Sequence, residues 1–328
     1  MNNNGSDLVS VIIPTKNPKK EMLMKCLNSI FSQTYSNFEI IIVDGSIKKP
    51  EIFNDNKKII YVKQKRRHVS GARQDGLDTA KGKYVVGLDS DCIAEPDWIE
   101  KIINAFDEKN KELFIIGRSL SMTESLVETN LQKEYDNWIN HVTCRLDQKR
   151  YSLTIDSKNY GFITEYGRKI GFDESLISGE DFDFATRARR KGYKIIYNQD
   201  AIVHHFHRPR LKELIHQKIW HGKGYGQNMV KNNIDFEHHF QMLNITLLIS
   251  LILLFPLFPL MVPLMFYALL KMKIKIKTRF IFSMIFYWSF IYGTIKGMYS
   301  KGGIKFLLLK IRSDLLNNIS YNPQIFYI

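Results

Sequence analysis

Residues 69–92 read VSGARQDGLDTAKGKYVVGLDSDC, and the apolar run at 84–88 ends abruptly in Asp89-Ser90-Asp91. The run is too short for a helix and rich in Val and Tyr, so it predicts a buried strand. Ligands of an open α/β sheet gather beyond the carboxyl ends of its strands, which is where these two carboxylates stand. Oxygen ligands of this kind suit Mg²⁺ or Mn²⁺. The alternative interpretation is an ordinary Asp-rich turn.

The segments before this strand predict a β-α-β unit of the same sheet. The runs 8–14 and 38–43 are rich in β-branched residues, and apolar residues at helical spacing over 21–34 connect them. Both runs end in polar residues, Thr15-Lys16-Asn17 and Asp44-Gly45-Ser46, as a nucleotide site requires. No G-x-G-x-x-G or P-loop turn follows the first run, which argues against a dinucleotide or P-loop site.

Two downstream groups of side chains are further candidates for chemistry. Glu180 and Asp181 precede a helical stretch, so they fall in a first helical turn, where carboxylates either stabilise the helix dipole or act as a general base. Histidines at 204, 205 and 207 follow two short strand-like pieces, 195–197 and 201–203. They could ligate a metal, shuttle a proton or lie in a polar loop.

Taken together, these motifs resemble the family 2 glycosyltransferases of the GT-A fold. The resemblance rests on VSVIIPTKN at 9–17, IIIVDGS at 40–46, GARQDGL at 71–77, Asp89-Ser90-Asp91, GFDE at 171–174 and GEDFDF at 179–184. It implies an α/β fold: a GT-A, Rossmann-like mixed sheet flanked by helices, forming a catalytic domain over residues 1–240.

The resemblance also implies a nucleotide-diphospho-sugar donor and a divalent metal. The residues that it assigns to donor binding are Pro14, Thr15, Asp44, Arg73 and Asp89. Asp91 would hold Mg²⁺ or Mn²⁺ on the diphosphate, with Asp89 beside it. Many relatives carry two acidic residues where this sequence has Asp44-Gly45, so the base of the donor stays open.

On the acceptor side, the resemblance points to Asp181 as the catalytic base, with Glu180 beside it. Direct displacement with one base would invert the anomeric configuration. His205 aligns best with a histidine that completes the metal shell in some relatives, although the adjacent His204 leaves the register open. Gln217 and Trp220 fall where processive relatives carry an acceptor-channel motif, Gln-x-x-Arg-Trp. The departure from Arg-Trp puts processive synthesis in doubt, and an interfacial helix is the alternative.

The net charge of +14 is concentrated near the carboxyl end. Between residues 271 and 312 there are ten Lys or Arg and no Asp or Glu, and long apolar stretches separate them. This pattern favours anionic membrane lipid over nucleic acid as a partner. The three cysteines are odd in number and share no metal-type spacing, which favours a reducing compartment.

Residues 241–328 are expected to form C-terminal membrane-associated helices. The segment 243–270 has 28 uncharged residues, enough to cross a bilayer, although Pro256, Pro259 and Pro263 interrupt it. The basic residues of 271–312 favour the cytoplasmic face, so we expect a re-entrant hairpin followed by an interfacial helix. Two full crossings and a buried soluble helix pair are the alternatives.

These observations predict a metal-dependent inverting glycosyltransferase at the cell membrane, with its catalytic domain on the cytoplasmic side. We expect a lipid-linked or cell-surface glycan acceptor, because a membrane segment would keep the site near such a substrate. A sugar-nucleotidyltransferase and a catalytically inactive membrane scaffold of the same fold are the alternatives.

Overall fold

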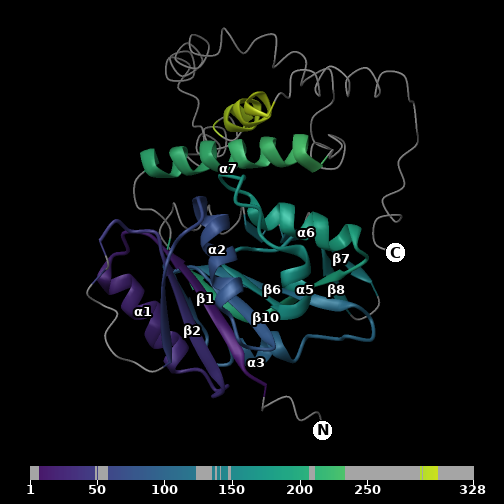
Figure 1. Ribbon diagram of the computed structural model, residues 1–328. Coiled ribbons are helices and arrows are strands. Elements are labelled where there is room, and N and C mark those ends of the chain that lie inside the picture. The colour runs from purple at the N-terminus through teal and green to yellow at the C-terminus, as the bar shows by residue number, and fades with distance from the viewer. Residues whose placement is uncertain are drawn as a thin grey trace, which may run out of the picture. The chain divides into compact units, whose positions relative to one another are not determined.

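The computed structural model describes residues 7–48, 50, 58–122, 135–136, 139–140, 142–146, 149–206, 211–232, 289 and 291–301 (Figure 1). The chain divides into two compact units at the junction of Arg210 and Leu211. The boundary expected at 240/241 lies outside the described residues.

The first unit is built on one mixed sheet with the strand order β3-β2-β1-β4-β9-β6-β10-β8-β7, and β5 pairs with β10. The strands are β1 (Val9–Thr15), β2 (Phe38–Asp44), β3 (Ile59–Lys63), β4 (Tyr84–Leu88), β5 (Cys92–Ala94), β6 (Glu112–Ser121), β7 (Thr143–Leu146), β8 (Lys149–Ser152), β9 (Asn159–Ile163) and β10 (Lys194–His205). Strands β3, β2, β1 and β4 are parallel, and β9 runs antiparallel between β4 and β6. The chain order reverses at β1, which has β2 on one side and β4 on the other. In open sheets this reversal creates a ligand crevice beyond the carboxyl ends of the two diverging strands.

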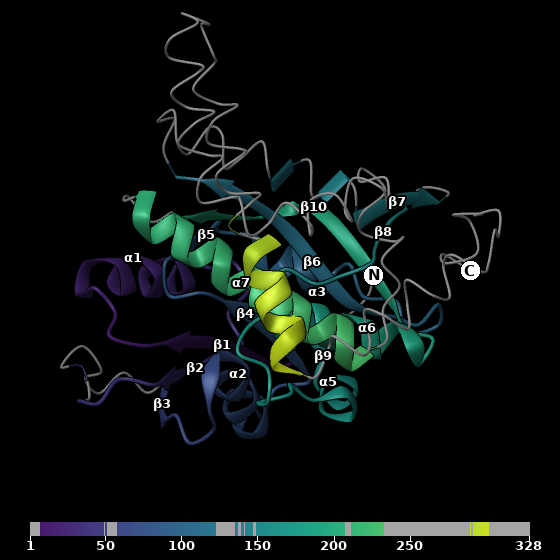
Figure 2. The same ribbon diagram turned by 90° about the horizontal axis from the view of Figure 1, so that it is seen from above.

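Helices cover both faces of this sheet (Figure 2). Those of the first unit are α1 (Lys20–Phe31), α2 (His68–Thr79), α3 (Trp98–Ile103), α5 (Thr164–Ile170) and α6 (Glu180–Arg190). The end of α1 is joined to the start of α3, because the backbone N–H of Ile99 donates to the side-chain oxygen of Gln33 over 3.0 Å. The α/β class and the flanking helices are therefore confirmed.

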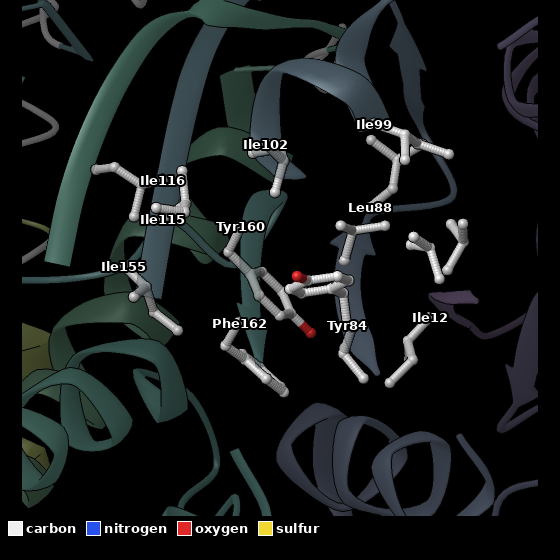
Figure 3. Close-up of a cluster of buried hydrophobic side chains, with 14 of the residues drawn as sticks. Ile12, Tyr84, Leu88, Ile99, Ile102, Ile115, Ile116, Ile155, Tyr160 and Phe162 are labelled. Carbon is white, nitrogen blue, oxygen red and sulfur yellow. The ribbon is translucent and has the colours of Figure 1, made fainter. Parts of the chain in front are cut away.

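The core lies where the central strands meet α3. Figure 3 shows Ile12 of β1, Leu88 of β4, Ile115 of β6 and Ile102 of α3 gathered around Tyr160 of β9. All five side chains are fully buried. Burial of these apolar side chains holds β4 in place. The packing of β4 therefore also positions the carboxylates that follow it.

Two predicted strands differ from the structure. The first continues through Pro14 to Thr15, because pairing of β1 with β4 stops at Ile12 and no hydrogen bond needs the missing proline N–H. The prediction of two pieces at 195–197 and 201–203 is wrong, since β10 is one strand. A register shift against β6 between Asn198 and Ile202 accommodates the polar residues that separated the two pieces in the sequence.

The second unit contains α7 (Leu211–Asn232) and a helical segment at 291–300. Their backbones touch, because a Cβ placed on Gly293 would lie 2.0 Å from the carbonyl oxygen of Ile219. Among the described residues, no helix is both long and apolar enough to span a bilayer. The predicted apolar segment 243–270 lies outside these residues, as does most of 271–312.

Candidate functional site

The Asp89-Ser90-Asp91 turn connects β4 to the short strand β5. The N–H of Cys92 donates to the carbonyl of Asp89 over 3.0 Å and closes the turn. The N–H of Phe206 donates to the carbonyl of Asp91, also over 3.0 Å, so the turn is tied to the end of β10. The Asp91 side chain is 50% exposed and can therefore meet a ligand from solvent.

The two adjacent histidines of β10 have different partners. His205 Nε2 lies 3.6 Å from Asp91 Oδ1, whereas His204 Nε2 lies 2.6 Å from Glu95 Oε1. Successive side chains of a strand point to opposite faces, which separates the two rings. The structure thus places His205, and not His204, beside the predicted metal ligand.

The Asp91 and His205 donors fit one divalent cation. Two ligand atoms that each lie about 2.1 Å from a Mg²⁺ ion are at most about 4.2 Å apart, and the separation of 3.6 Å falls within that limit. Burial would raise the pKa of Asp91, but the His205 side chain outweighs it and holds this pKa below its usual range. Asp91 is therefore ionised, which is the form that a cation binds.

Arg73 of α2 is the centre of a buried polar cluster. Its Nη1 lies 2.7 Å from Glu180 Oε1 and its Nη2 lies 2.7 Å from Asp89 Oδ1. Nη2 also donates to the carbonyl of Ser157 over 3.1 Å. Burial would lower the pKa of Arg73, yet the charges of Glu180 and Asp89 outweigh it and raise this pKa. The guanidinium is a permanent cation between two carboxylates that come from distant parts of the chain.

Asp89 is oriented differently from Asp91. Its carboxylate contacts Arg73, and burial raises its pKa to about 6. The predicted role of Asp89 in metal binding stays a prediction, because the described hydrogen bond of its carboxylate is to the guanidinium of Arg73.

Glu180 and Asp181 begin α6, as the sequence predicts. The residue before them, Gly179, has a φ of 71°, a left-handed conformation that glycine adopts without strain. Glu180 is buried against Arg73, and burial raises its pKa to about 7. Asp181 is only partly buried, and its Oδ1 and Oδ2 accept the N–H groups of Phe182 and Ser157 over 2.8 and 3.4 Å. Burial also raises the pKa of Asp181.

Ser157 connects the two acidic groups. Its carbonyl accepts from Arg73, which holds Asp89, and its N–H donates to Asp181. No pattern in the sequence points to this residue, which lies in a loop before β9 and belongs to no motif. The predicted donor-side residues Arg73 and Asp89 and the predicted catalytic residues Glu180 and Asp181 therefore lie in one connected cluster.

Thr15 and Asp44 occupy paired positions at the ends of β1 and β2. Asp44 is fully buried; its Oδ1 accepts from the N–H and hydroxyl of Ser46, and its Oδ2 accepts from the hydroxyl of Tyr61. The buried hydroxyl oxygen of Thr15 has no hydrogen-bond partner among the residues that the structure describes. Both residues and Pro14 thus stand at the edge of the sheet where β1 and β4 diverge.

Gln217 and Trp220 lie on α7 of the second unit, and the Trp220 side chain is 41% exposed. Their acceptor-side role stays a prediction. A cavity of about 1030 Å³ in the first unit lies elsewhere, between the end of α3 and the β7–β8 hairpin. None of the predicted site residues lines it.

The chain is similar to several known glycosyltransferases. It is 28% identical to "Glycosyltransferase AglE" of Haloferax volcanii over 71% of this chain and 77% of that protein. It is 26% identical to the "Dolichyl N-acetyl-alpha-D-glucosaminyl phosphate 3-beta-D-2,3-diacetamido-2,3-dideoxy-beta-D-glucuronosyltransferase" of Methanococcus voltae, over 67% of this chain and 73% of that protein. The third relative, "Glycosyltransferase GlyA" of Streptococcus pneumoniae, is 28% identical over 66% of this chain. The chain spans only 33% of the length of this pneumococcal relative.

A solved structure, "Crystal structure of GalNAc-T7 with UDP, GalNAc and Mn2+", shares 16% identity with a TM-score of 0.49, over 68% of this chain and 47% of that one. The profile of the family described as "Glycosyl transferase family 2" matches residues 10–173, which hold every predicted donor-side residue. The chain therefore belongs to glycosyltransferase family 2.

Proposed function

We propose that the chain is a metal-dependent inverting glycosyltransferase that passes one sugar from a nucleotide-diphospho-sugar to a lipid-linked or cell-surface glycan acceptor. The observation that carries this proposal is the buried Arg73, which joins Asp89 to Glu180, the neighbour of Asp181. One buried cation thereby holds a donor-side carboxylate and the residue next to the candidate base.

The donor is proposed to bind across the ends of β1 and β4. Thr15 has a buried hydroxyl without a described partner, and three hydrogen bonds hold Asp44 at the adjoining strand end, so the proposal places the base and ribose beside these two positions. Asp89 would contact the ribose side while Arg73 keeps its carboxylate in place. Preorganised groups of this kind lose little entropy on binding.

Transfer builds negative charge on the leaving diphosphate. Mg²⁺ or Mn²⁺ held by Asp91 and His205 would neutralise that charge and so lower the barrier. The two side chains present one oxygen and one nitrogen to the same point, with Asp91 ionised.

Asp181 is proposed as the base that removes the proton of the acceptor hydroxyl. It is less enclosed than Glu180, and burial raises its pKa, which makes it a stronger proton acceptor than an ordinary aspartate. Glu180 is proposed as a positioning residue, because its carboxylate is bound to Arg73 and buried. One base acting in a single displacement inverts the anomeric carbon.

The proposed acceptor is lipid-linked, and the proposed location is the cytoplasmic face of the cell membrane. The Methanococcus relative is named as acting on a dolichyl phosphate sugar, which supports such an acceptor. The 28 uncharged residues of 243–270 and the ten basic residues of 271–312 support a region at 241–328 that binds anionic lipid. In the same proposal, Gln217 and Trp220 contribute to the acceptor side.

The test is product analysis with the purified full-length protein and a panel of nucleotide sugars in Mn²⁺. Release of nucleoside diphosphate is expected with at least one donor, and Asp91→Ala should abolish it. The matched control is Asp97→Ala, which removes a half-exposed carboxylate six positions further on. Release of pyrophosphate would instead indicate a sugar-nucleotidyltransferase, and no turnover of any donor would indicate an inactive scaffold.

A further inference from the structure

The thiol of Cys92 lies beside the two residues proposed to hold the metal. Cys92 Sγ is 3.9 Å from Asp91 Oδ1, and His205 Nε2 is 3.6 Å from the same oxygen. The donor atoms of these three residues all lie within 4.8 Å of one another. A sulfur, a nitrogen and an oxygen donor therefore lie close enough together to bind one cation.

Strand pairing explains this proximity. Cys92 and His205 are directly opposed in the antiparallel pair of β5 and β10, and opposed residues of such a pair share a face of the sheet. Asp91 is fixed at the same place by the hydrogen bond from Phe206. The three donors come from two strands and one turn that the backbone holds in register.

The separations of Asp91 Oδ1 from the other two donors are close to those of a tetrahedral site for a thiophilic cation, and the sulfur and nitrogen lie within 4.8 Å of each other. In a tetrahedral zinc site, bonds of about 2.3 Å to sulfur and about 2.1 Å to nitrogen or oxygen place the ligand atoms about 3.4 to 3.6 Å apart. The observed 3.6 and 3.9 Å are within a few tenths of an ångström of these values. Hard cations such as Mg²⁺ prefer oxygen ligands in octahedral geometry and bind thiolates weakly.

We propose that Asp91, Cys92 and His205 form a binding site for Zn²⁺, with Cys92 as the ligand that favours it over Mg²⁺ and Mn²⁺. Binding replaces the thiol proton of Cys92 with the metal; the proton passes to solvent and no electron is transferred. Zn²⁺ and the activating cation would then exclude one another, because both use Asp91 and His205. That competition rests on the proposed function, whereas the zinc site rests on the three donors alone.

The other two cysteines do not belong to the group of three donors. The Cys26 thiol donates to the carbonyl of Asp89 over 3.6 Å, and Cys144 lies on β7. Each can therefore be replaced to isolate the contribution of Cys92.

The first experiment uses Co²⁺ as a spectroscopic probe of the full-length protein. Thiolate bound to Co²⁺ gives an intense near-ultraviolet charge-transfer band, so we expect this band in the wild type and its loss on adding excess Zn²⁺. The double variant Cys26→Ser, Cys144→Ser should keep the band, because Cys92 is then the one remaining thiol. Absence of the band from the wild type, or from a folded double variant, would overturn the proposal.

The second experiment compares two cations on the variant Cys92→Ser. Competition with a chromophoric chelator should show at least a tenfold loss of Zn²⁺ affinity, whereas Mn²⁺ affinity, followed by the electron paramagnetic resonance of free Mn²⁺, should change less than threefold. Equal losses for both cations would assign Cys92 a merely structural role and overturn the proposal. If the variant does not fold, the Co²⁺ band of the double variant decides.

These readouts separate the zinc site from the proposed function. A thiolate band in a protein that transfers no sugar would support the site and contradict the function. Sugar transfer in a protein without the band would do the reverse.

Discussion

Arg73 and Glu180 are 107 positions apart in the chain, yet Arg73 Nη1 lies 2.7 Å from Glu180 Oε1, and both side chains are almost completely buried. The pair joins α2 to the start of α6 and so fixes the neighbouring Asp181 relative to Asp89. A buried ion pair becomes costly when one partner is removed, because the other is left uncompensated.

Replacing Arg73 should therefore destabilise the first unit. Arg73→Met leaves the carboxylates of Asp89 and Glu180 buried without their cation, and we expect a loss of about 3 kcal/mol or more in the free energy of unfolding. Arg145→Met is the control, since Arg145 is an exposed residue of β7, and it should change stability by less than about 0.5 kcal/mol. Denaturant unfolding measures both. Equal stability of the two variants would contradict the assigned role of Arg73.

Replacing Asp181 should separate binding from transfer. Asp181→Asn keeps the shape of the side chain but cannot take a proton, so the rate of transfer should fall by about 10² to 10⁴ while donor affinity stays within about threefold. Glu165→Gln, on an exposed residue of α5, should leave both unchanged. Single-turnover kinetics and donor titration provide the two numbers. A normal rate in Asp181→Asn would remove this residue from the base role.

The adjacent histidines provide a matched pair for the metal site. His205→Ala should weaken Mn²⁺ binding by about tenfold or more, because it removes a donor 3.6 Å from Asp91. His204→Ala should leave Mn²⁺ binding within about twofold, since His204 contacts Glu95 instead. Titration of free Mn²⁺ by electron paramagnetic resonance measures both affinities. The reverse order of effects would show that β10 presents the other histidine to the metal.

Stability should depend on pH through Glu180. Burial raises its pKa to about 7 in the folded protein, against the opposing charge of Arg73, whereas the ordinary value is 4.5. Between about pH 4.5 and 7 the folded state holds a proton that the unfolded state has lost, so this contribution to stability falls as pH rises through that window.

The variant Glu180→Gln isolates this effect. Asp89 and Asp181 also have raised pKa values and contribute with the same sign, and Asp91 contributes with the opposite sign. Unfolding in chelator at pH 5 and pH 8 should therefore show a smaller pH dependence in Glu180→Gln than in the wild type. Identical pH dependence in the two proteins would exclude a raised pKa at Glu180.

Two glycines with left-handed backbone conformation flank α6, and replacing each in turn distinguishes the effect of backbone strain on stability from its effect on transfer. Gly179 and Gly192 have φ values of 71° and 80°, so alanine at either should cost about 1 kcal/mol of stability. Gly179→Ala should also lower the transfer rate, because this residue sets the start of α6 and hence the direction of Asp181. Gly192→Ala should leave the rate within about twofold. Equal rates in both variants would show that the start of α6 tolerates this strain without moving the base.

Local patterns made the fold predictable as far as the central strands. Short β-branched runs with polar ends predicted β1, β2 and β4, and the ordered motifs after them predicted the family, which is confirmed. β9 was not predicted, because its five residues show no alternation of apolar and polar side chains. It nevertheless lies between β4 and β6 in the middle of the sheet.

The contacts of the site depend on strand pairing and helix packing between distant segments, which the spacing of residues along the sequence does not reveal. The choice between His204 and His205 required the register of β5 against β10, and β5 is only three residues long. The contact of Arg73 with Glu180 required the packing of two helices on the sheet. Ser157 has no signal in the sequence, because its backbone groups, and not its side chain, make the contacts.

The most direct test of the account is the release of nucleoside diphosphate from a nucleotide sugar by wild-type protein, in Mn²⁺ and in excess chelator, beside Asp91→Ala. We predict release in Mn²⁺ and a loss of at least a hundredfold both in chelator and in the variant. Equal release in chelator, or full activity of Asp91→Ala, would contradict a metal-assisted transfer at the end of β4.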